Sequence, residues 1–473
     1  MTAALAALLS GAMFYLSQGL DNVWALAWLA PAPLLWLAYG VTPRWQVLAA
    51  SFAAFVAGQA YVVQCYWGML PPLIVAPLEI AMCSLFPLTV LFAGEVLRRV
   101  SALVALVTFP VSWASVEFIV GQFSPHGTFG SLAYAEVSFP AGIQITSLFG
   151  LYAVTFLLCL SANAVALGLR EKWRAAGAGA AVCALALIFG LIRLAEPAGQ
   201  RLEVAALSDA DVWHAESRSG TLGSRVAAAE TYAAFIKRQR GIGVFVTPEG
   251  SVQMSEDAQK PVLTPLAAAS REAHALLVVG TYIPTPEQNR AFAFFPDGTA
   301  KTYAKRHLLA PFEMEAPGRG SGYLGDGFST QICKDMDFPA TVRQTARHGV
   351  RLMIVPANDF KRDGWVHARM AVMRGVENGF AVLRTASNGL ETSSDAEGRL
   401  LASASTMRSG MVMAKADVPL GPGPTLYTRI GDTFGWLCVA FLFAIGAYTL
   451  FFEKRTTWAQ RSEYFSARID PNV

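Results

Sequence analysis

The sequence predicts a polytopic α-helical membrane bundle of about eight spans joined to an α/β domain. Hydrophobic residues make up 54% of the 473 residues and charged residues only 15%, which is too apolar for an ordinary soluble protein of this size. The charges gather in 200–420, whereas 433–452 carries none. We therefore expect three parts, namely a membrane domain (1–196), a polar α/β domain (197–430), and a final transmembrane helix with a basic tail (431–473).

The apolar segments have the length of membrane-spanning helices. A helix needs about 20 apolar residues to cross a bilayer, and the hydrocarbon satisfies no free backbone groups, so each span must be helical. The first segment lacks the basic start of a signal peptide and is followed by further spans. We predict spans near 3–20, 23–40, 46–65, 72–96, 101–120, 142–168, 176–194 and 433–452.

Basic residues fall in alternate loops, which predicts the orientation. Loops that stay in the cytoplasm are enriched in Lys and Arg. Seven spans from a cytoplasmic N-terminus place 197–430 outside, and the eighth returns the chain to the basic side. The basic residues concerned are Arg44, Arg98, Arg99, Arg170, Lys172 and Arg174, then Lys454, Arg455, Arg461 and Arg468 after the last span.

The polar domain alternates short strands with helices, which indicates an α/β sheet covered by helices. Segment 291–305 reads as a hairpin that turns at Asp297-Gly298. Glu249, Cys333 and Asn358 each fall where a predicted strand gives way to a loop. Sites in open α/β sheets gather at the carboxyl ends of strands, so we expect these three residues to converge.

Cys333 is the only cysteine of the polar domain, because the other cysteines lie in apolar runs. A thiol attacks as its thiolate and needs a base or a positive neighbour. A carboxylate can take the proton, and a lysine can stabilise both the thiolate and the oxyanion that forms. This chemistry needs neither metal nor cofactor. The cysteines form no CxxC or disulfide pattern, and the histidines lack the spacing of metal ligands.

Three segments resemble the blocks of the nitrilase (carbon-nitrogen hydrolase) superfamily, in the order of that family. They are FVTPEG (245–250), YAKRHLLAPFE (303–313) and ICKDMDFP (332–339). The resemblance implies an αββα sandwich with Glu249 as general base, Lys305 as the lysine that stabilises the oxyanion, and Cys333 as nucleophile.

The resemblance also suggests supporting residues. A second carboxylate of the site falls at Glu313 or Glu315, and we favour Glu313. Asp335 stands where the family typically has Glu. Ordinary surface charge is the alternative for Glu313 and Asp335, and a turn residue is the alternative for Asn358.

Within that superfamily, the layout is similar to the apolipoprotein N-acyltransferase family. The segments at 129–158, 357–359, 367–389 and 423–436 resemble corresponding regions of that family. This resemblance implies transfer of an acyl chain from a phospholipid, through a Cys thioester, to the amino group of a diacylglyceryl-cysteine lipoprotein. It also implies a bacterial inner membrane location with the catalytic domain on the periplasmic side.

Other functions remain open from the sequence. The chain could be a membrane-bound amidohydrolase of the nitrilase type, or an acyltransferase with a different amine acceptor. A third alternative is a transporter-like or scaffolding protein that retains the nitrilase shell without catalysis. Nucleic-acid binding is disfavoured, because the net charge is only +3 and no basic patch is interleaved with aromatic residues.

Overall fold

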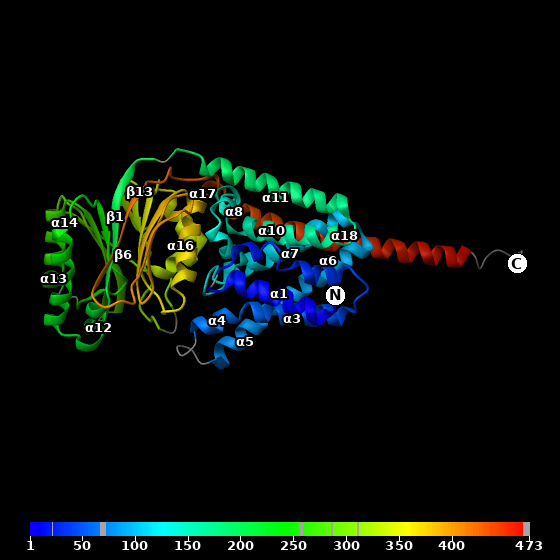
Figure 1. The fold of residues 1–473 in the computed structure, drawn as a ribbon, viewed down its shortest axis with the longest axis horizontal. Coiled ribbons are helices and arrows are strands. Elements are labelled where there is room, and N and C mark those ends of the chain that lie inside the picture. Colours follow the sequence, from blue (N-terminus) through cyan, green and yellow to red (C-terminus); the bar gives the residue numbers. More distant parts are fainter. Residues whose placement is uncertain are drawn as a thin grey trace, which may run out of the picture.

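The computed structural model describes residues 1–20, 22–66, 72–197, 199–255, 259–284, 287–309 and 312–466. Its N-terminal part is a bundle of helices, joined to a two-sheet α/β part (Figure 1). The bundle contains α1 (Ala3–Gln18), η1 (Trp24–Leu26), α2 (Ala32–Ala38), α3 (Arg44–Gly58), α4 (Ala60–Tyr66), α5 (Pro72–Cys83), α6 (Leu85–Arg99), α7 (Ala102–Phe123), η2 (Leu132–Ser138), α8 (Pro140–Ile143), α9 (Thr146–Phe149), α10 (Leu151–Gly168) and α11 (Trp173–Leu194).

Long apolar helices confirm the membrane bundle. Within the described ranges, 6 helical stretches are long and apolar enough to cross a membrane, and Ala3–Gln18 is a shorter apolar helix. The six stretches are Arg44–Tyr66, Glu79–Arg99, Ala102–Phe123, Leu151–Gly168, Trp173–Leu194 and Thr433–Phe451.

The prediction of a continuous helix over 23–40 is wrong. The segment contains only the short turn η1 and the seven-residue helix α2. Pro31 precedes α2 and Pro33 lies in its first turn, and a proline ring cannot continue a helix that precedes it because it lacks an N–H donor. Leu34 and Leu35 are fully buried in the bundle, so this segment packs against neighbouring helices instead of spanning the bilayer alone.

The segment predicted as one span over 142–168 is also divided. Helix α10 begins only at Leu151, directly after Gly150, whose φ of 78° interrupts the helical path. A Cβ at Gly150 would lie 2.4 Å from the ring of Tyr427, which precedes the last helix. The break therefore brings the N-terminus of α10 close to the α/β part.

The α/β part contains two sheets. One has the order β13-β1-β2-β4-β5-β6, with β3 paired to β4, and the other has the order β12-β11-β10-β9-β8-β7. The strands are β1 (Arg201–Asp209), β2 (Val244–Val246), β3 (Val252–Gln253), β4 (Leu276–Pro284), β5 (Glu287–Phe294), β6 (Ala300–Ala304), β7 (Tyr323–Gly325), β8 (Phe328–Thr330), β9 (Leu352–Asn358), β10 (Ala381–Ser387), β11 (Leu390–Ser394), β12 (Leu400–Ser405) and β13 (Met411–Pro419).

The predicted αββα sandwich is confirmed. Apolar side chains from both sheets form one core between them. A second core lies under α13 and α14 on one outer face, and a third lies under α15 and α16 on the other. The helices of this part are α12 (Ala210–Ser219), α13 (Leu222–Arg238), α14 (Gln259–Ala273), η4 (Cys333–Asp337), α15 (Pro339–Ala346) and α16 (Gly364–Asn378).

Helix α16 lies between the α/β part and the bundle (Figure 1). Its side chains Met370, Met373 and Val376 belong to the core of the membrane helices, whereas Ala371 faces the sheet core. The chain then continues through α17 (Leu426–Ile430) into α18 (Thr433–Ser466), which packs along α7. The sandwich is thus held against the bundle by one of its own covering helices.

Candidate active site

The predicted site residues follow the ends of strands from both sheets. Glu249 follows β2, Lys305 follows β6, Cys333 follows β8 and Asn358 ends β9. The two sheets are joined at this point, because the Glu249 N–H donates to the carbonyl oxygen of Ala357 at 3.1 Å. The predicted hairpin is present as β5 and β6, with Gly298 at φ 90° in its turn.

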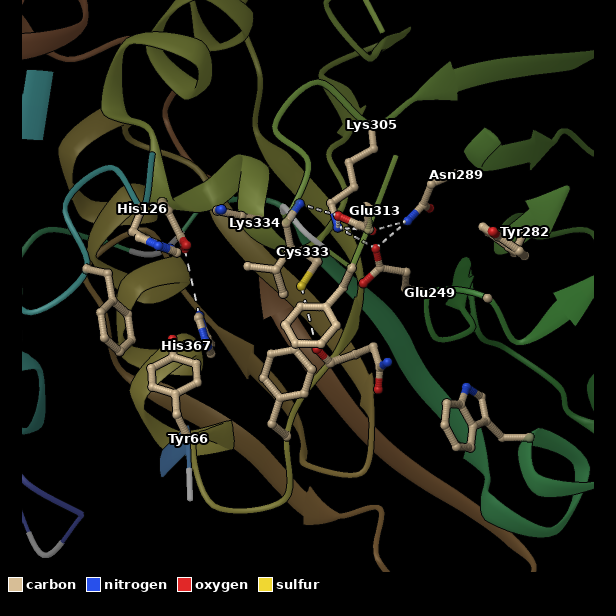
Figure 2. Close-up of a pocket in the computed structure, with 18 of the residues that line it drawn as sticks. Tyr66, His126, Glu249, Tyr282, Asn289, Lys305, Glu313, Cys333, Lys334 and His367 are labelled. Atoms are coloured by element: carbon tan, nitrogen blue, oxygen red, sulfur yellow. Dashed lines mark hydrogen bonds and ion pairs between the residues drawn. The ribbon is translucent and has the colours of Figure 1, made fainter. Parts of the chain in front are cut away.

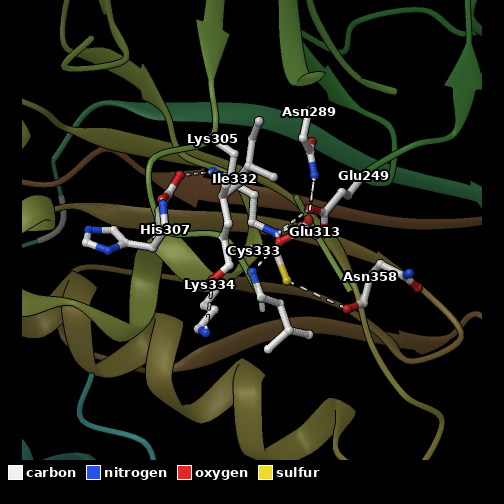
Figure 3. A network of polar contacts seen from close by, with 12 residues as sticks. Glu249, Asn289, Lys305, His307, Glu313, Ile332, Cys333, Lys334 and Asn358 are labelled. Carbon is white, nitrogen blue, oxygen red and sulfur yellow. Dashed lines mark hydrogen bonds and ion pairs between the residues drawn. The ribbon is translucent and has the colours of Figure 1, made fainter. Parts of the chain in front are cut away.

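Lys305 lies between two carboxylates (Figure 3). Its Nζ is 2.7 Å from Glu249 Oε1 and 2.7 Å from Glu313 Oε1. Asn289 Nδ2 donates to the same two oxygens, at 2.6 Å for Glu249 and 3.0 Å for Glu313. The lysine side chain is only 3% exposed. This network fixes one ammonium and two carboxylates in a site that is nearly closed to water.

Charge balance keeps Lys305 protonated. Burial opposes the charge of its ammonium, but the neighbouring Glu249, Cys333 and Glu313 outweigh this effect and raise its pKa well above the usual value. A lysine that stays cationic at every physiological pH can stabilise negative charge as it develops on a substrate.

The cysteine sits on a constrained backbone. Cys333 has a φ of 45°, in the left-handed region that residues with a side chain seldom adopt and that often occurs at functional sites. Its Sγ lies 3.6 Å from the carbonyl oxygen of Asn358 and can donate to it. Figure 3 shows the sulfur beside Lys305 and the glutamates, with its contact directed toward Asn358. The predicted strand to Cys333 is shorter than expected, since β8 ends at Thr330 and η4 begins at Cys333.

The thiol is protonated in the resting site. Burial and the adjacent Glu249 raise the pKa of Cys333 well above its ordinary value, although Lys305 and Arg384 act in the opposite direction. A protonated thiol is a weak nucleophile, so attack by Cys333 would require a base that removes its proton. Glu249 is a carboxylate of the same cavity and can serve this purpose.

Asp335 organises the backbone around the site and does not line its cavity. One of its oxygens accepts from the N–H groups of Arg306 and His307, at 3.0 and 2.8 Å. The other accepts from Tyr303 Oη at 2.7 Å and from the N–H of Ile332 at 3.1 Å. Burial raises the pKa of Asp335 to about 6. The carboxyl thus ties the segment after Lys305 to the segment before Cys333.

The geometry separates the two candidates for the second carboxylate. Glu313 contacts Lys305, and its other oxygen accepts from the N–H of Leu309 at 2.6 Å. Glu315 is also buried but lines a different cavity, together with Glu287 and Arg290. Asn358 is the last residue of β9 and not part of a turn, and its carbonyl oxygen lies 3.6 Å from the Cys333 sulfur.

A buried ion pair supports the loop after Asn358. The guanidinium of Arg384, on β10, binds both carboxylate oxygens of Asp359, with Nη1 at 3.1 Å from Oδ2. Space around Asp359 is tight, because a Cβ at Gly389 would lie 2.0 Å from its Oδ2. Arg384 also places a positive charge close enough to lower the pKa of Cys333.

The candidate residues line one cavity of about 270 Å³ (Figure 2). Cys333, Lys305, Glu249, Glu313 and Asn358 belong to its wall. The membrane bundle closes part of the cavity, since Tyr66 of α4 and His126 and Phe129 after α7 also line it. Further lining residues are Trp213, Gln253, Tyr282, Asn289, Lys334, Asp337, Phe360 and His367.

Sequence reasoning missed several of these residues. Asn289 is an ordinary polar residue near the start of β5, and the pairing of β5 with β6 brings it to Lys305. Tyr66, His126 and Phe129 come from the bundle, and no local pattern indicates that they reach the α/β part. Among the residues described, no group of three or more His, Cys, Asp and Glu side chains is arranged to hold a metal ion.

Two domain families match the chain. The apolipoprotein N-acyltransferase N-terminal domain matches residues 10–164, and the carbon-nitrogen hydrolase domain matches residues 210–420. The solved structure of Saccharomyces cerevisiae Nit3, from branch 10 of the nitrilase superfamily, is 21% identical. That similarity covers 48% of this chain and 92% of Nit3, with a TM-score of 0.37.

Similar proteins align along nearly the whole chain. Apolipoprotein N-acyltransferase of Geobacter metallireducens is 25% identical over 508 residues, which cover 92% of this chain and 93% of the relative. The protein of that name from Vibrio vulnificus is 22% identical over 511 residues, covering 96% of this chain and 97% of the relative. The chain contains both domains, and the relatives of that name align along nearly its whole length. The chain therefore belongs to the apolipoprotein N-acyltransferase family.

Proposed function

We propose that this protein transfers a fatty acyl chain from a phospholipid to the free amino group of a diacylglyceryl-cysteine lipoprotein, through a thioester on Cys333. The observation that carries the proposal is a Glu-Lys-Cys cavity whose wall is completed by residues of a membrane bundle. Both substrates are anchored in lipid, so a cavity that borders membrane helices has access to them.

The first half-reaction acylates the enzyme. Glu249 takes the proton of the Cys333 thiol as the sulfur attacks the ester carbonyl of the phospholipid. The Lys305 ammonium stabilises the oxyanion that develops on the former carbonyl oxygen. When this intermediate collapses, the bond to the glycerol oxygen breaks, and Glu249 returns the proton to that oxygen. A lysophospholipid leaves and a thioester remains.

The second half-reaction runs through the same groups. The lipoprotein amine attacks the thioester carbonyl, Glu249 accepts a proton from the nitrogen, and Lys305 again stabilises the oxyanion. The carbon–sulfur bond then breaks, the Cys333 sulfur recovers its proton, and an amide is released. In this scheme Glu313 and Asn289 hold Lys305 and Glu249 in place, and Asp335 fixes the backbone on either side.

The periplasmic face of a bacterial inner membrane is the location that accords with this chemistry. Loops rich in Lys and Arg stay in the cytoplasm. The proposal therefore places 197–430 on the other side of the membrane. Matured lipoprotein N-termini carry their lipid on the outer side of that membrane, so donor and acceptor would meet the cavity in the same leaflet.

Trapping the acyl-enzyme tests the proposal. Purified protein is incubated with a phospholipid labelled in its acyl chain, and adducts are mapped by mass spectrometry. We expect a hydroxylamine-sensitive adduct on Cys333 that disappears when a diacylglyceryl lipopeptide with a free amine is added. Cys333→Ala should abolish it, whereas Cys438→Ala, in the membrane helix α18, should retain it.

The outcomes separate the alternatives. If water discharges the adduct and the lipopeptide does not change the rate of this discharge, the result would favour a hydrolase. An adduct discharged by a different amine would favour a different acceptor. Full transfer activity in Cys333→Ala would contradict the proposal altogether.

A further inference from the structure

The cavity contains a second lysine that the mechanism does not use. Lys334 follows Cys333 directly, is only 6% exposed and lines the same cavity. Its Nζ donates to the carbonyl oxygen of Leu308 at 3.2 Å. An ammonium has three N–H donors. Within the described ranges of the chain, no carboxylate lies within ion-pair distance of this ammonium.

Three other buried cations of the α/β part pair with carboxylates, whereas the buried Arg369 of α16 donates to the carbonyl oxygens of Gln18 and Gly19 in the bundle. Lys305 pairs with two glutamates, Arg384 with Asp359, and Arg374 with Glu377. A buried charge without a partner is strongly unfavourable, so proteins pair such charges or bring them to a ligand. Lys334 differs from Arg369 because it lines the cavity that holds Cys333 and directly follows that residue.

The nearby carboxylates are already engaged. Asp337 and Glu313 act on Lys334 electrostatically through space. Glu313, however, binds Lys305 at 2.7 Å, and Asp337 lies 3.8 Å from the ring of His367. An anion that enters the cavity can therefore pair with the Lys334 ammonium.

Lys334 lies on the side of the cavity that the membrane bundle closes. Figure 2 shows Lys334 and His126 on one side of Cys333, with Glu249, Asn289 and Tyr282 on the other. His126 follows helix α7, and burial together with Lys334 lowers its pKa, so its ring is neutral and offers one hydrogen-bond donor. A lipid that enters from the bundle side would bring its polar head past these two residues.

We propose that Lys334 binds the phosphodiester of the acyl-donor lipid and so selects donors that carry a phosphate on the acylated glycerol. This inference rests on the proposed function. In a glycerophospholipid the phosphate is separated from the reactive ester only by the glycerol carbons, which suits a cation on the residue next to the nucleophile. The phosphate takes part in no bond change and leaves with the lysophospholipid.

Donor selectivity tests the inference. The rate of Cys333 acylation is measured with a phospholipid and with a diacylglycerol of the same acyl chains, in the same detergent. The expected result is a fall of roughly tenfold in the phospholipid-to-diacylglycerol ratio of kcat/KM for Lys334→Met, because a charge-assisted contact is lost. Lys334→Arg should keep most of the ratio. Lys415→Met, which removes an exposed charge on β13, should not change it.

Equal loss with both donors, or an unchanged ratio, would overturn the inference. A binding measurement that needs no chemistry separates it from the proposed function. In a Cys333→Ala background, a short-chain phospholipid should bind more tightly than the matching diacylglycerol, and Lys334→Met should remove the difference. Inorganic phosphate that binds as tightly as the phospholipid would overturn the assignment to a lipid head group. Absence of any acyl adduct in the unmodified protein would instead contradict the proposed function.

Discussion

At the scale of single residues, the site depends on how one lysine balances two carboxylates. Lys305 contacts Glu249 and Glu313 with its ammonium, and all three side chains are largely buried. Removal of the ammonium would leave two carboxylates with no counter-charge in a poorly hydrated site, which is costly. The same ammonium is the group that can meet an oxyanion. In the proposed mechanism Lys305 therefore contributes to both stability and catalysis.

Lys305→Met should lower the rate of Cys333 acylation by about 10²–10³-fold, the usual effect of losing an oxyanion donor. Rapid quenching followed by mass spectrometry of the labelled adduct measures this rate. Lys301→Met is the matched control, because this lysine lies on the preceding strand β6 and its ammonium contacts the Leu324 carbonyl and the Phe295 ring outside the cavity. Adding Glu313→Gln to Lys305→Met should recover stability without recovering the rate. An acylation rate close to that of the unmodified protein would refute the role given to Lys305.

At the scale of elements, one histidine joins three segments around the cavity. His367 of α16 lies 3.2 Å from Asp363, in the loop before that helix, and 3.8 Å from Asp337 at the end of η4. Burial disfavours the imidazolium, but the two carboxylates outweigh it and raise the pKa of His367 to about 10. The charged ring therefore stabilises the folded arrangement.

This linkage predicts a stability that depends on pH. A histidine in the unfolded chain has a pKa of about 6.5. The contribution of His367 to the free energy of unfolding is therefore fully present below that pH and is lost as the pH rises toward about 10. Thermal unfolding in detergent at pH 6.5 and pH 9.5 measures it. The fall in Tm between these pH values should be smaller in His367→Gln than in the unmodified protein, and unchanged in His348→Gln, which alters an exposed histidine. Equal falls in all three proteins would disprove the linkage.

Local patterns predicted most elements and failed where distant segments decide the structure. The alternation of strands and helices predicted the α/β part, and the turn signal at Asp297-Gly298 located the hairpin of β5 and β6. Hydropathy alone could not detect that Pro31 divides the 23–40 segment, because the apolar character continues across the break. The choice between Glu313 and Glu315 likewise depends on which carboxylate the chain turns toward Lys305. That direction is a property of packing and not of spacing.

At the scale of the whole molecule, the sandwich and the bundle share buried polar contacts as well as a cavity wall. Glu377 of α16 accepts from the N–H of Leu151 at the start of α10, at 2.7 Å. Arg374, one turn earlier, donates to Tyr134 Oη of η2 at 2.8 Å. Thr128 also donates to the carbonyl oxygen of Asp337, beside the cavity. These three contacts form the seam between the bundle and the sandwich, which is centred on α16. The position of the bundle residues in the cavity depends on this seam.

Removing Glu377 tests whether this seam holds the two parts together. Arg374 and Glu377 form an ion pair at 2.8 Å in which both side chains are fully buried. Glu377→Ala leaves a buried guanidinium uncompensated and an N–H at the start of α10 without its acceptor, so we expect a loss of about 3–5 kcal/mol of stability. The change should appear as a lower Tm in detergent and as faster proteolysis between the bundle and the sandwich.

The double variant Arg374→Met/Glu377→Met separates the effect of the buried ion pair from the effect of the hydrogen bond to Leu151. Apolar replacement of both partners of a buried pair commonly restores stability, so its Tm should lie well above that of Glu377→Ala. It cannot restore the acceptor for Leu151, because methionine offers no carboxylate. Acylation from phospholipid should therefore remain below that of the unmodified protein even where the Tm has recovered, since the bundle side of the cavity has lost a fixed contact. Recovery of both properties together would mean that the seam contributes only charge balance and does not position the lipid-facing wall.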